Sequence, residues 1–499
     1  MGIVQKDAIR TSFISFLGLI LGYLNKGFLF VVLFSSAQVG LVNLIMNVSL
    51  LFAQFANLGT NYSSWRFFPF FRNESRHHYG FLLLNLLIVC IGVLFFSLII
   101  IGAKNLVILT YSQNSHLFIQ YYYYTIPLGI AIVFFQLFEN HLRGMRENVL
   151  PVFLQDVFLR LCTSMVLLAT YLNYIDFQQF FILYILLHFI APCYLLIYLI
   201  KKRELSFSLK SIQLPTRFKR IIFSYSLFSY VNSLAALLVV SLDSLMIAKY
   251  KGLADTGVYT TTILLISAVL FPYRSVIRVS TPLVSKQWKE RDERGMISLY
   301  QKSSSLGLLI GVLGFLVVWL PINEFFHFIP AYNDGIWVFF FLMLGRVVDM
   351  YFGLNGVILS TSKKYKADFY FTVILIVCVY AFNLFLIPKY GIVGAAISTG
   401  FVYVFYNLLR GWYIYKVYSL NPFQTIQMKL LGFLCFFLIL YYSIMFFSND
   451  LSRLSSIYMR ILTKEALLLI GFIFPIYWLN LEPESVQFVR SLKTKIFKK

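Results

Sequence analysis

Long apolar stretches alternate with short polar segments along nearly the whole chain. Each stretch has roughly the 20 residues that an α-helix needs to cross the hydrocarbon core of a membrane. The longest connecting segments, 201–220 and 282–302, are too short to fold as a catalytic domain. The pattern predicts fourteen transmembrane helices at about 12–34, 39–60, 80–103, 118–140, 151–172, 178–200, 221–248, 257–281, 303–321, 335–359, 367–387, 392–415, 429–447 and 464–481.

The composition agrees with this pattern. Of the 499 residues, 60% are hydrophobic and 12% are charged, and the mean hydropathy is +0.78. Soluble domains carry about 25% charged residues, so this chain has too few polar residues to cover a folded surface in water. We therefore predict an all-α polytopic membrane protein.

The net charge of +22 reflects membrane topology. If the N-terminus is cytoplasmic, 30 of the 42 Lys and Arg residues fall on the cytoplasmic side, seven on the opposite side and five within the predicted helices. Positive charge accumulates on the cytoplasmic side of membrane proteins, so both termini are predicted to be cytoplasmic. The basic residues are spread over every inner loop, which argues against a nucleic-acid partner.

The spacing of the predicted helices repeats. A shift of about 217 residues, the distance from Gly40 to Gly257 in two predicted outer turns, places each of the first six helices on one of the next six. Two pseudo-symmetric six-helix lobes are expected, at 1–205 and 206–420. Residues 421–499 supply an extra helix pair and a basic cytoplasmic tail. Parallel repeats of this kind in transporters enclose a substrate site between them.

Eight charged residues within the predicted helices are candidates for a functional site, and Glu139 lies at the inner end of the helix 118–140. Each would cost about 2.5–3.5 kcal/mol facing lipid at mid-bilayer on insertion scales, so most must face a wet cavity, the other lobe or one another. Because cations exceed acids, a cavity lined by them favours an anionic substrate. The cations are Lys26, Arg160, Arg274, Arg278 and Arg346, and the acids are Asp156, Asp243 and Asp349.

Sequence spacing divides some of these charged residues into couples on one helical face. Asp156 and Arg160 are four residues apart and Arg346 and Asp349 three apart, so each couple could form an ion pair on one helical face. Arg274 and Arg278 share one face without a nearby acid. Three interpretations stay open for them: contact with lipid headgroups, binding of an anionic ligand, or a salt bridge between the lobes.

Two further interpretations remain open. Lys26 and Asp243 occupy equivalent positions in the repeat, fourteen residues before Gly40 and Gly257. They could form a gate salt bridge, Asp243 could couple transport to an ion, or the pair could be structural. His188 is either a hydrogen-bonded core residue or a proton relay.

The sequence lacks the motifs of the common enzyme classes. It contains no P-loop, HExxH or GxSxG motif and no Cys/His cluster. The five cysteines lie in apolar stretches without a CxxC pair and are interpreted as packing residues. An integral-membrane glycosyltransferase or polymerase would need a larger extramembrane domain. We therefore predict a protein that is not an enzyme, with no cofactor and no metal site.

Several stretches resemble polysaccharide repeat-unit flippases, the O-antigen and capsule exporters of the multidrug/oligosaccharidyl-lipid/polysaccharide exporter superfamily. The resemblance covers the whole chain, including the count of fourteen helices. The stretches that carry it are TSFISFLGLILGYLNKGFLF, DSLMIAKYKGLADTGVYTTT, GRVVDMYFGLNGVILSTSKKYKAD and NLFLIPKYGIVGAAISTG.

The resemblance implies a flippase of the bacterial cytoplasmic (inner) membrane that translocates an undecaprenyl-diphosphate-linked oligosaccharide by alternating access, for O-antigen, lipopolysaccharide or capsule biosynthesis. The five cations would contact the diphosphate, and Asp156, Asp243 and Asp349 are candidate coupling or gating acids. The implied partners are this lipid-linked substrate, a coupling ion (H⁺ or Na⁺), membrane lipid and polysaccharide-assembly proteins. Two alternatives are a cation-coupled multidrug extruder on the same fold and a non-transporting scaffold for glycan assembly.

Overall fold

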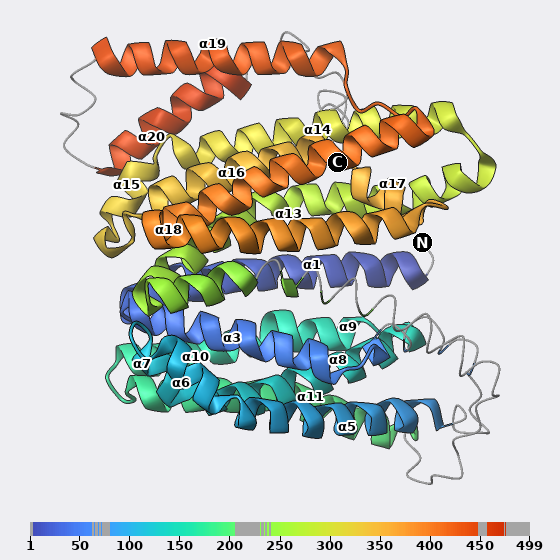
Figure 1. Cartoon of the computed structure of the whole chain (residues 1–499), viewed down its shortest axis with the longest axis vertical. Helices are drawn as coiled ribbons and strands as arrows, with labels where there is room; N and C mark the ends of the chain where they lie inside the picture. The colour runs from blue at the N-terminus through green and yellow to red at the C-terminus, as the bar shows by residue number, and fades with distance from the viewer. Residues whose placement is uncertain are drawn as a thin grey trace, which may run out of the picture. The chain divides into compact units, whose positions relative to one another are not determined.

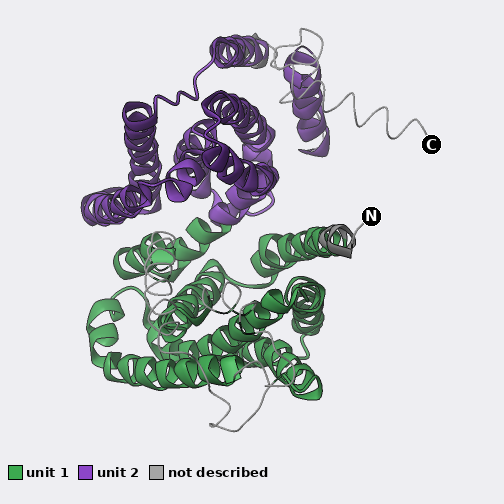
Figure 2. Cartoon of the chain, turned by 90° about the vertical axis from the view of Figure 1, so that its right-hand side faces the viewer, with its two compact units in different colours: residues 1–261 green, residues 262–499 purple. Residues whose placement is uncertain are grey.

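The fold is entirely helical in the residues that the structure describes, and it is that of a multi-pass membrane protein (Figure 1). The structure is a computed structural model. It describes residues 3–61, 64, 68, 71, 80–204, 230, 234, 237–238, 241–447, 457–473 and 475. These residues form two compact units, 1–261 and 262–499, coloured green and purple in Figure 2. The predicted lobe boundaries at 205 and 420 stay a prediction.

Unit 1 contains long apolar helices joined by short turns. The described elements are α1 (Ile3–Tyr23), the π-helical segment η1 (Leu24–Leu29), α2 (Phe30–Leu33), α3 (Ser36–Ala56), α5 (Phe81–Gly102), α6 (Lys104–Tyr111), α7 (His116–Tyr121), the 3-10 turn η3 (Tyr122–Tyr124), α8 (Thr125–Met145), α9 (Val149–Val152), the π-helical segment η4 (Phe153–Phe158), α10 (Leu159–Tyr171) and α11 (Phe177–Lys201).

Unit 2 has the same kind of helices and also includes the C-terminal ones. Its described elements are most of α13 (Leu253–Glu290), α14 (Glu293–Trp319), α15 (Ile322–His327), the 3-10 turn η6 (Pro330–Tyr332), α16 (Gly335–Tyr351), α17 (Asn355–Thr361), α18 (Tyr365–Tyr418), α19 (Thr425–Phe447), α20 (Ile457–Leu468) and the π-helical segment η8 (Leu469–Ile473). The first turns of α13, residues 253–261, belong to unit 1.

The helix starts follow local hydrogen-bonding rules. Ser35 begins α3 with a capping box: its hydroxyl accepts from the Gln38 N–H at 3.3 Å, and the Gln38 side chain accepts from the Ser35 N–H at 3.0 Å. Asp176 and Gln179 form the same arrangement at the start of α11. Each box satisfies two N–H groups that the helix itself leaves unbonded, which matters most in lipid, where water does not replace them.

The described residues hold ten helices long and apolar enough to cross a membrane, or eleven if α16 and α17, which meet at 53°, count as one bent span. The 54-residue α18 is long enough for two crossings. Gly391 interrupts it with φ of 60° and ψ of −139°, a conformation essentially reserved for glycine. This break lies between the predicted helices 367–387 and 392–415. The total of fourteen stays a prediction, since 221–248 and 464–481 lie partly outside the described residues.

Two glycines allow α3 and the first turns of α13 to cross at close range within unit 1. A Cβ on Gly40 would lie 1.9 Å from the Leu253 carbonyl oxygen, and one on Gly257 would lie 2.0 Å from the Ser36 carbonyl oxygen. The contact is reciprocal, because Gly257 and Leu253 each lie 217 residues after Gly40 and Ser36. Such reciprocity is what a two-fold related pair of helices produces.

Candidate functional site

Two π-helical segments inside long apolar helices of unit 1 carry polar and charged residues. Segment η1 carries Asn25 and Lys26, and segment η4 carries Gln155 and Asp156. The helix α1 packs against η4 and α10, and η1 against α10. A π-helical turn widens the helix locally and is frequently found at functional sites. These two segments therefore form the core of the candidate site in unit 1.

The couple Asp156 and Arg160 lies against a glycine face of α1. Arg160 Nη2 is 3.5 Å from Asp156 Oδ1, which is the ion pair that the spacing suggested. Ser15 donates to Asp156 Oδ2 at 2.8 Å, and Arg160 also donates to the Gly18 carbonyl. A Cβ on Gly22 would lie 2.4 Å from Arg160 Nη1, so a larger residue there would displace the guanidinium.

Lys26 has no such partner among the described residues. Its half-buried ammonium makes no hydrogen bond or ion pair with any residue that the structure describes, and Arg160 is close enough to repel it. The neighbouring Asn25 is buried: its amide donates to the Arg160 carbonyl at 2.8 Å and accepts from Ser164 at 2.7 Å. Asn25 thus holds η1 against α10, and Lys26 and Arg160 place two positive charges together in one membrane-spanning region.

A partly open cavity of about 120 Å³ lies in unit 1, lined in part by Gln155 of η4 and Leu159 of α10. His188 on α11 lines it and forms a hydrogen bond between Nδ1 and the Tyr184 carbonyl at 2.7 Å, while its role as a core residue or a proton relay stays a prediction. Lys26 lies within electrostatic range of His188. The residues around the cavity are Met46, Leu50, Ala131, Ile132, Phe135, Gln136, Gln155, Leu159, His188 and Ala191.

Asp243 is buried in unit 1 and is not paired with Lys26. Its carboxylate accepts a hydrogen bond from the Tyr259 hydroxyl at 2.5 Å. The two side chains come from the helical residues before and after the turn at 251–252, so the contact holds that turn closed. The Lys26–Asp243 salt bridge suggested by the repeat is absent from this structure, and a coupling or gating role for Asp243 stays a prediction.

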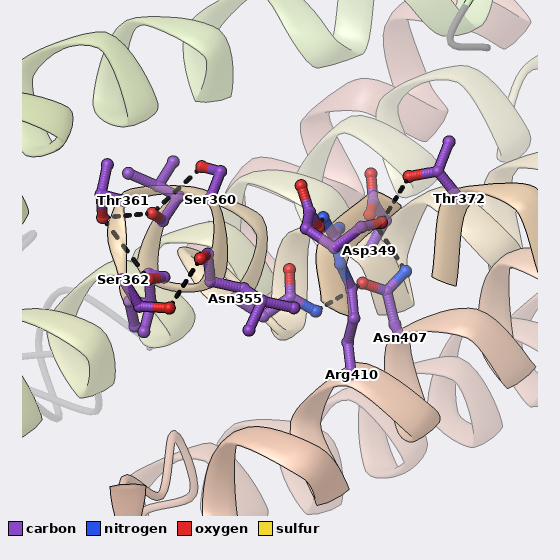
Figure 3. Close-up of polar contacts among 12 residues, drawn as sticks. Asp349, Asn355, Ser360, Thr361, Ser362, Thr372, Asn407 and Arg410 are labelled. Atoms are coloured by element: carbon purple, nitrogen blue, oxygen red, sulfur yellow. Dashed lines mark hydrogen bonds and ion pairs between the residues drawn. The ribbon is translucent and has the colours of Figure 1, made fainter. Parts of the chain in front are cut away.

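Unit 2 has a polar network of its own, shown in Figure 3. Arg346 Nη1 lies 3.8 Å from Asp349 Oδ2, and the guanidinium stacks 4.1 Å above the Tyr403 ring. Asn407 on α18 donates to Asp349 Oδ1 at 3.0 Å and accepts from Asn355 at 2.8 Å. The bend between α16 and α17 brings Asn355 into this network.

Arg410 extends the network and was missed by sequence reasoning. It is 9% exposed, donates to the Asp368 carboxylate, and lies 4.5 Å above the Tyr406 ring. The count of charges by side assigns it to the cytoplasmic loops, because it is near the end of a predicted helix. Its partner on α18 is 42 residues away in sequence, so local spacing carries no signal for the pair.

Arg274 and Arg278 are exposed on α13 and form no hydrogen bond or ion pair with a described residue. The structure therefore leaves the headgroup and ligand interpretations of these two residues open. Among the described residues, no group of three or more His, Cys, Asp and Glu could hold a metal ion. All five cysteines are free.

Comparisons with solved structures place this arrangement of helices among known transporters. Lipid II flippase MurJ in an inward closed conformation superposes with a TM-score of 0.71 at 15% identity, covering 95% of this chain and 99% of that one. An inward-facing multidrug resistance MATE transporter superposes with a TM-score of 0.63 at 14% identity, covering 84% and 95%. The chain has the fold of the multidrug/oligosaccharidyl-lipid/polysaccharide exporter superfamily. These neighbours are transporters, not enzymes.

Sequence comparison adds two weaker matches. A capsular polysaccharide biosynthesis protein, CapF of Staphylococcus aureus, is 27% identical over 173 residues, or 33% of this chain and 42% of CapF. An uncharacterised membrane protein of Methanocaldococcus jannaschii is 24% identical over 226 residues, or 44% of each chain. The matched part thus spans less than half of both relatives. No family model matches the chain.

Proposed function

We propose that this protein is a flippase that moves an undecaprenyl-diphosphate-linked oligosaccharide across the bacterial cytoplasmic membrane by alternating access, for O-antigen, lipopolysaccharide or capsule biosynthesis. The observation that carries the proposal is the ammonium of Lys26, which has no hydrogen-bond or ion-pair partner among the described residues and lies near Arg160. A charge within a membrane span is costly unless it is paired. A diphosphate supplies the missing negative charge at this point in unit 1.

The two cations suit a diphosphate in different ways. The planar fork of Arg160 can donate two parallel hydrogen bonds to phosphate oxygens, while Lys26 acts as a point charge that donates in any direction. Because Arg160 is already 3.5 Å from Asp156, a phosphate would compete with this carboxylate for the guanidinium. Substrate binding would then release Asp156 from Arg160, while Asp156 keeps its hydrogen bond from Ser15 on α1.

Unit 2 contains a second ion pair, Arg346 and Asp349, in which a phosphate could also compete with the carboxylate for the guanidinium. Arg346 is shared between Asp349 and the Tyr403 ring, and its 3.8 Å separation from Asp349 is too long for a strong hydrogen bond. A phosphate on Arg346 would release Asp349, which remains hydrogen-bonded to Asn407. Asp349 is therefore our proposed coupling acid, with H⁺ or Na⁺ as the ion, and Asp156 and Asp243 are proposed gating acids.

Arg274 and Arg278 complete the proposed substrate contacts. They are exposed and unpartnered among the described residues, and like charges four residues apart on a helix repel one another. An anion next to both would remove this repulsion. The resemblance of CapF supports a role in surface polysaccharide synthesis, and MurJ shows that this fold accommodates lipid-linked substrates.

A cation-coupled multidrug extruder would have the same fold. The positive charge of the candidate site in unit 1 argues against an extruder of cations, because Lys26 and Arg160 would repel a cationic compound. A carboxylate without a cationic partner would be expected at that position instead. Both termini are proposed to be cytoplasmic, on the distribution of Lys and Arg.

The proposal is tested by deleting the gene in its natural host and extracting the membrane lipids. We expect a lipid-linked glycan to accumulate on the inner leaflet and surface polysaccharide to disappear. The wild-type gene should restore both, Lys26→Gln should not, and the exposed matched control Lys251→Gln should. Deletion without accumulation of any lipid-linked glycan would contradict the flippase assignment.

A further inference from the structure

We infer that the cavity of unit 1 binds an uncharged sugar of the lipid-linked glycan, next to the cations that hold its diphosphate. This inference rests on the proposed function and adds a second, chemically distinct part to the substrate site. It follows from the size of the cavity, from the hydrogen-bonding groups that line it, and from its position beside Lys26 and Arg160.

The cavity has the size of one ring. Its volume of about 120 Å³ is close to that of an engineered cavity of about 150 Å³ that takes up benzene. Three elements form its apolar wall, with Met46 and Leu50 from α3, Phe135 from α8 and Leu159 from α10. Such a wall suits a pyranose ring, whose C–H face is apolar while its edge carries polar groups.

Two amide side chains at the cavity keep hydrogen-bonding groups that no described residue satisfies. Gln155, on the membrane-spanning segment η4, has an exposed side chain that makes no hydrogen bond with any residue that the structure describes. Gln136 accepts from Asn61 at 3.0 Å through Oε1, which leaves both hydrogens of its amide nitrogen available. An amide without a hydrogen bond in an apolar environment costs several kcal/mol on alkane transfer scales, so the half-buried amide of Gln136 favours a polar ligand, which the exposed Gln155 can also reach.

His188 adds an acceptor to these donors. Its Nδ1 is held by the Tyr184 carbonyl at 2.7 Å, which keeps the proton on Nδ1 and presents the Nε2 lone pair. The cavity thus offers amide donors from Gln136 and Gln155 and acceptors from Gln155 and His188. A sugar hydroxyl both donates and accepts, so this mixed set matches a ring that carries several hydroxyl or acetamido groups.

The lining also excludes other ligands. None of the ten lining residues is an acid, so the cavity lacks the carboxylate that a coupling cation would need. None is Lys or Arg, so it has no fixed positive charge of its own for a phosphate. An apolar ligand such as a lipid tail would leave the amides of Gln136 and Gln155 without hydrogen bonds.

Residues that line the cavity are direct sequence neighbours of residues in the charged site. Gln155 and Leu159 line the cavity, and the next residues in sequence, Asp156 and Arg160, form the ion pair of the candidate site. Lys26 lies within electrostatic range of His188. A diphosphate on Lys26 and Arg160 would therefore place the first sugar, which is bonded directly to it, at the cavity.

The test compares two lipids with the full-length protein in nanodiscs. One is the lipid-linked glycan extracted from the deletion strain, and the other is undecaprenyl diphosphate, which has no sugar. The wild-type protein should bind the glycan-bearing lipid about tenfold more tightly, as expected for two additional hydrogen bonds of ordinary strength. The variant Gln136→Leu/Gln155→Leu should lose this preference and bind undecaprenyl diphosphate as the wild type does.

Unchanged binding of undecaprenyl diphosphate also shows that the variant is folded. The exposed Gln120, outside the cavity, supplies the matched control, and Gln120→Leu should keep the tenfold preference. A double variant that still prefers the glycan-bearing lipid, or a wild type that binds both lipids equally, would overturn the sugar site and leave the flippase standing. A wild type that binds neither lipid would overturn both proposals.

Discussion

Asn43 donates a hydrogen bond to Thr260 at 3.0 Å, and 217 residues separate the two. The same offset relates Gly40 to Gly257, whose missing side chains let α3 and the first turns of α13 meet. The sequence repeat is thus visible as a physical contact, in which a residue of one helix meets its own counterpart. A contact of this kind is self-complementary, so both glycines are required for the same reason.

Substituting either glycine should destabilise the protein. Gly40→Ala and Gly257→Ala would each place a Cβ about 2 Å from a backbone carbonyl oxygen, which cannot be relieved by a side-chain rotation. Overpacking of this kind costs about 1–3 kcal/mol. Thermal unfolding of the purified protein should show the loss.

Gly432 provides the matched control for this prediction. A Cβ there would meet nothing within 4 Å, and the residue lies inside the helix α19. Gly432→Ala should therefore stabilise the protein slightly, by up to about 1 kcal/mol, because alanine has the higher helix propensity. Equal effects at all three glycines would show that the α3–α13 crossing is not tightly packed.

The crossing should also open during transport if alternating access operates. Cysteines at Asn43 and Thr260 would lie close enough to be joined by a short bifunctional thiol reagent, because the native side chains are in hydrogen-bonding contact. Joining them should reduce flipping in proteoliposomes to near background. The single variants, treated identically, should keep their activity, and full activity of the joined protein would mean that these helices stay together throughout the cycle.

Removing Arg274 and Arg278 together should abolish surface polysaccharide without lowering the amount of protein. The variant Arg274→Ala/Arg278→Ala removes two exposed charges that have no partner among the described residues. Lys286→Ala/Lys289→Ala removes the same charge from the same helix and should leave polysaccharide unchanged. Normal polysaccharide in the arginine variant would favour the headgroup interpretation.

Much of this fold is predictable from hydrophobicity alone, because lipid imposes one requirement on every span. Each crossing must be a long apolar helix, and the predicted first helix, 12–34, agrees closely with the observed 10–33. The Asp156–Arg160 pair was also accessible, since i,i+4 spacing on a helix fixes the distance. The break at Gly391 falls between two predicted helices.

The rest depends on tertiary contacts that local spacing does not encode. The partners of Arg410 and Lys464 lie 42 and 140 residues away in sequence. Gln136 and Gln155 carry no charge and fall in apolar stretches, where a search for intramembrane charges passes over them. A search for any side-chain amide within a predicted span would have found both.

Asn407 should be essential to the network of unit 2. Asn407→Leu would leave the amide of Asn355 without its acceptor and Asp349 without a donor, at a cost of about 1–3 kcal/mol. Thermal unfolding would measure this loss. The double variant Asn355→Leu/Asn407→Leu should be less destabilised than the sum of the single variants, because no amide of this pair is left unpaired and the loss at Asp349 equals that in Asn407→Leu. Strict additivity would show that the two amides act independently.

The buried pair Glu324 and Lys464 should anchor the C-terminal helices. Lys464 on α20 lies 2.7–2.8 Å from both carboxylate oxygens of Glu324 on α15 and 3.1 Å from the Leu320 carbonyl, and both side chains are less than 10% exposed. Removing the cation alone leaves a buried carboxylate, so Lys464→Met should cost about 3–5 kcal/mol.

Replacing both Glu324 and Lys464 leaves no unpaired buried charge. Glu324→Leu/Lys464→Met should therefore regain most of the stability lost in Lys464→Met, because a buried ion pair contributes little beyond offsetting its own desolvation. Thermal unfolding of the wild type, the two single variants and the double variant closes the cycle. A double variant as unstable as Lys464→Met would mean that the pair contributes net attraction between α15 and α20. In that case electrostatics, and not the apolar contacts of α19 and α20 with α14, would hold the C-terminal helices in place.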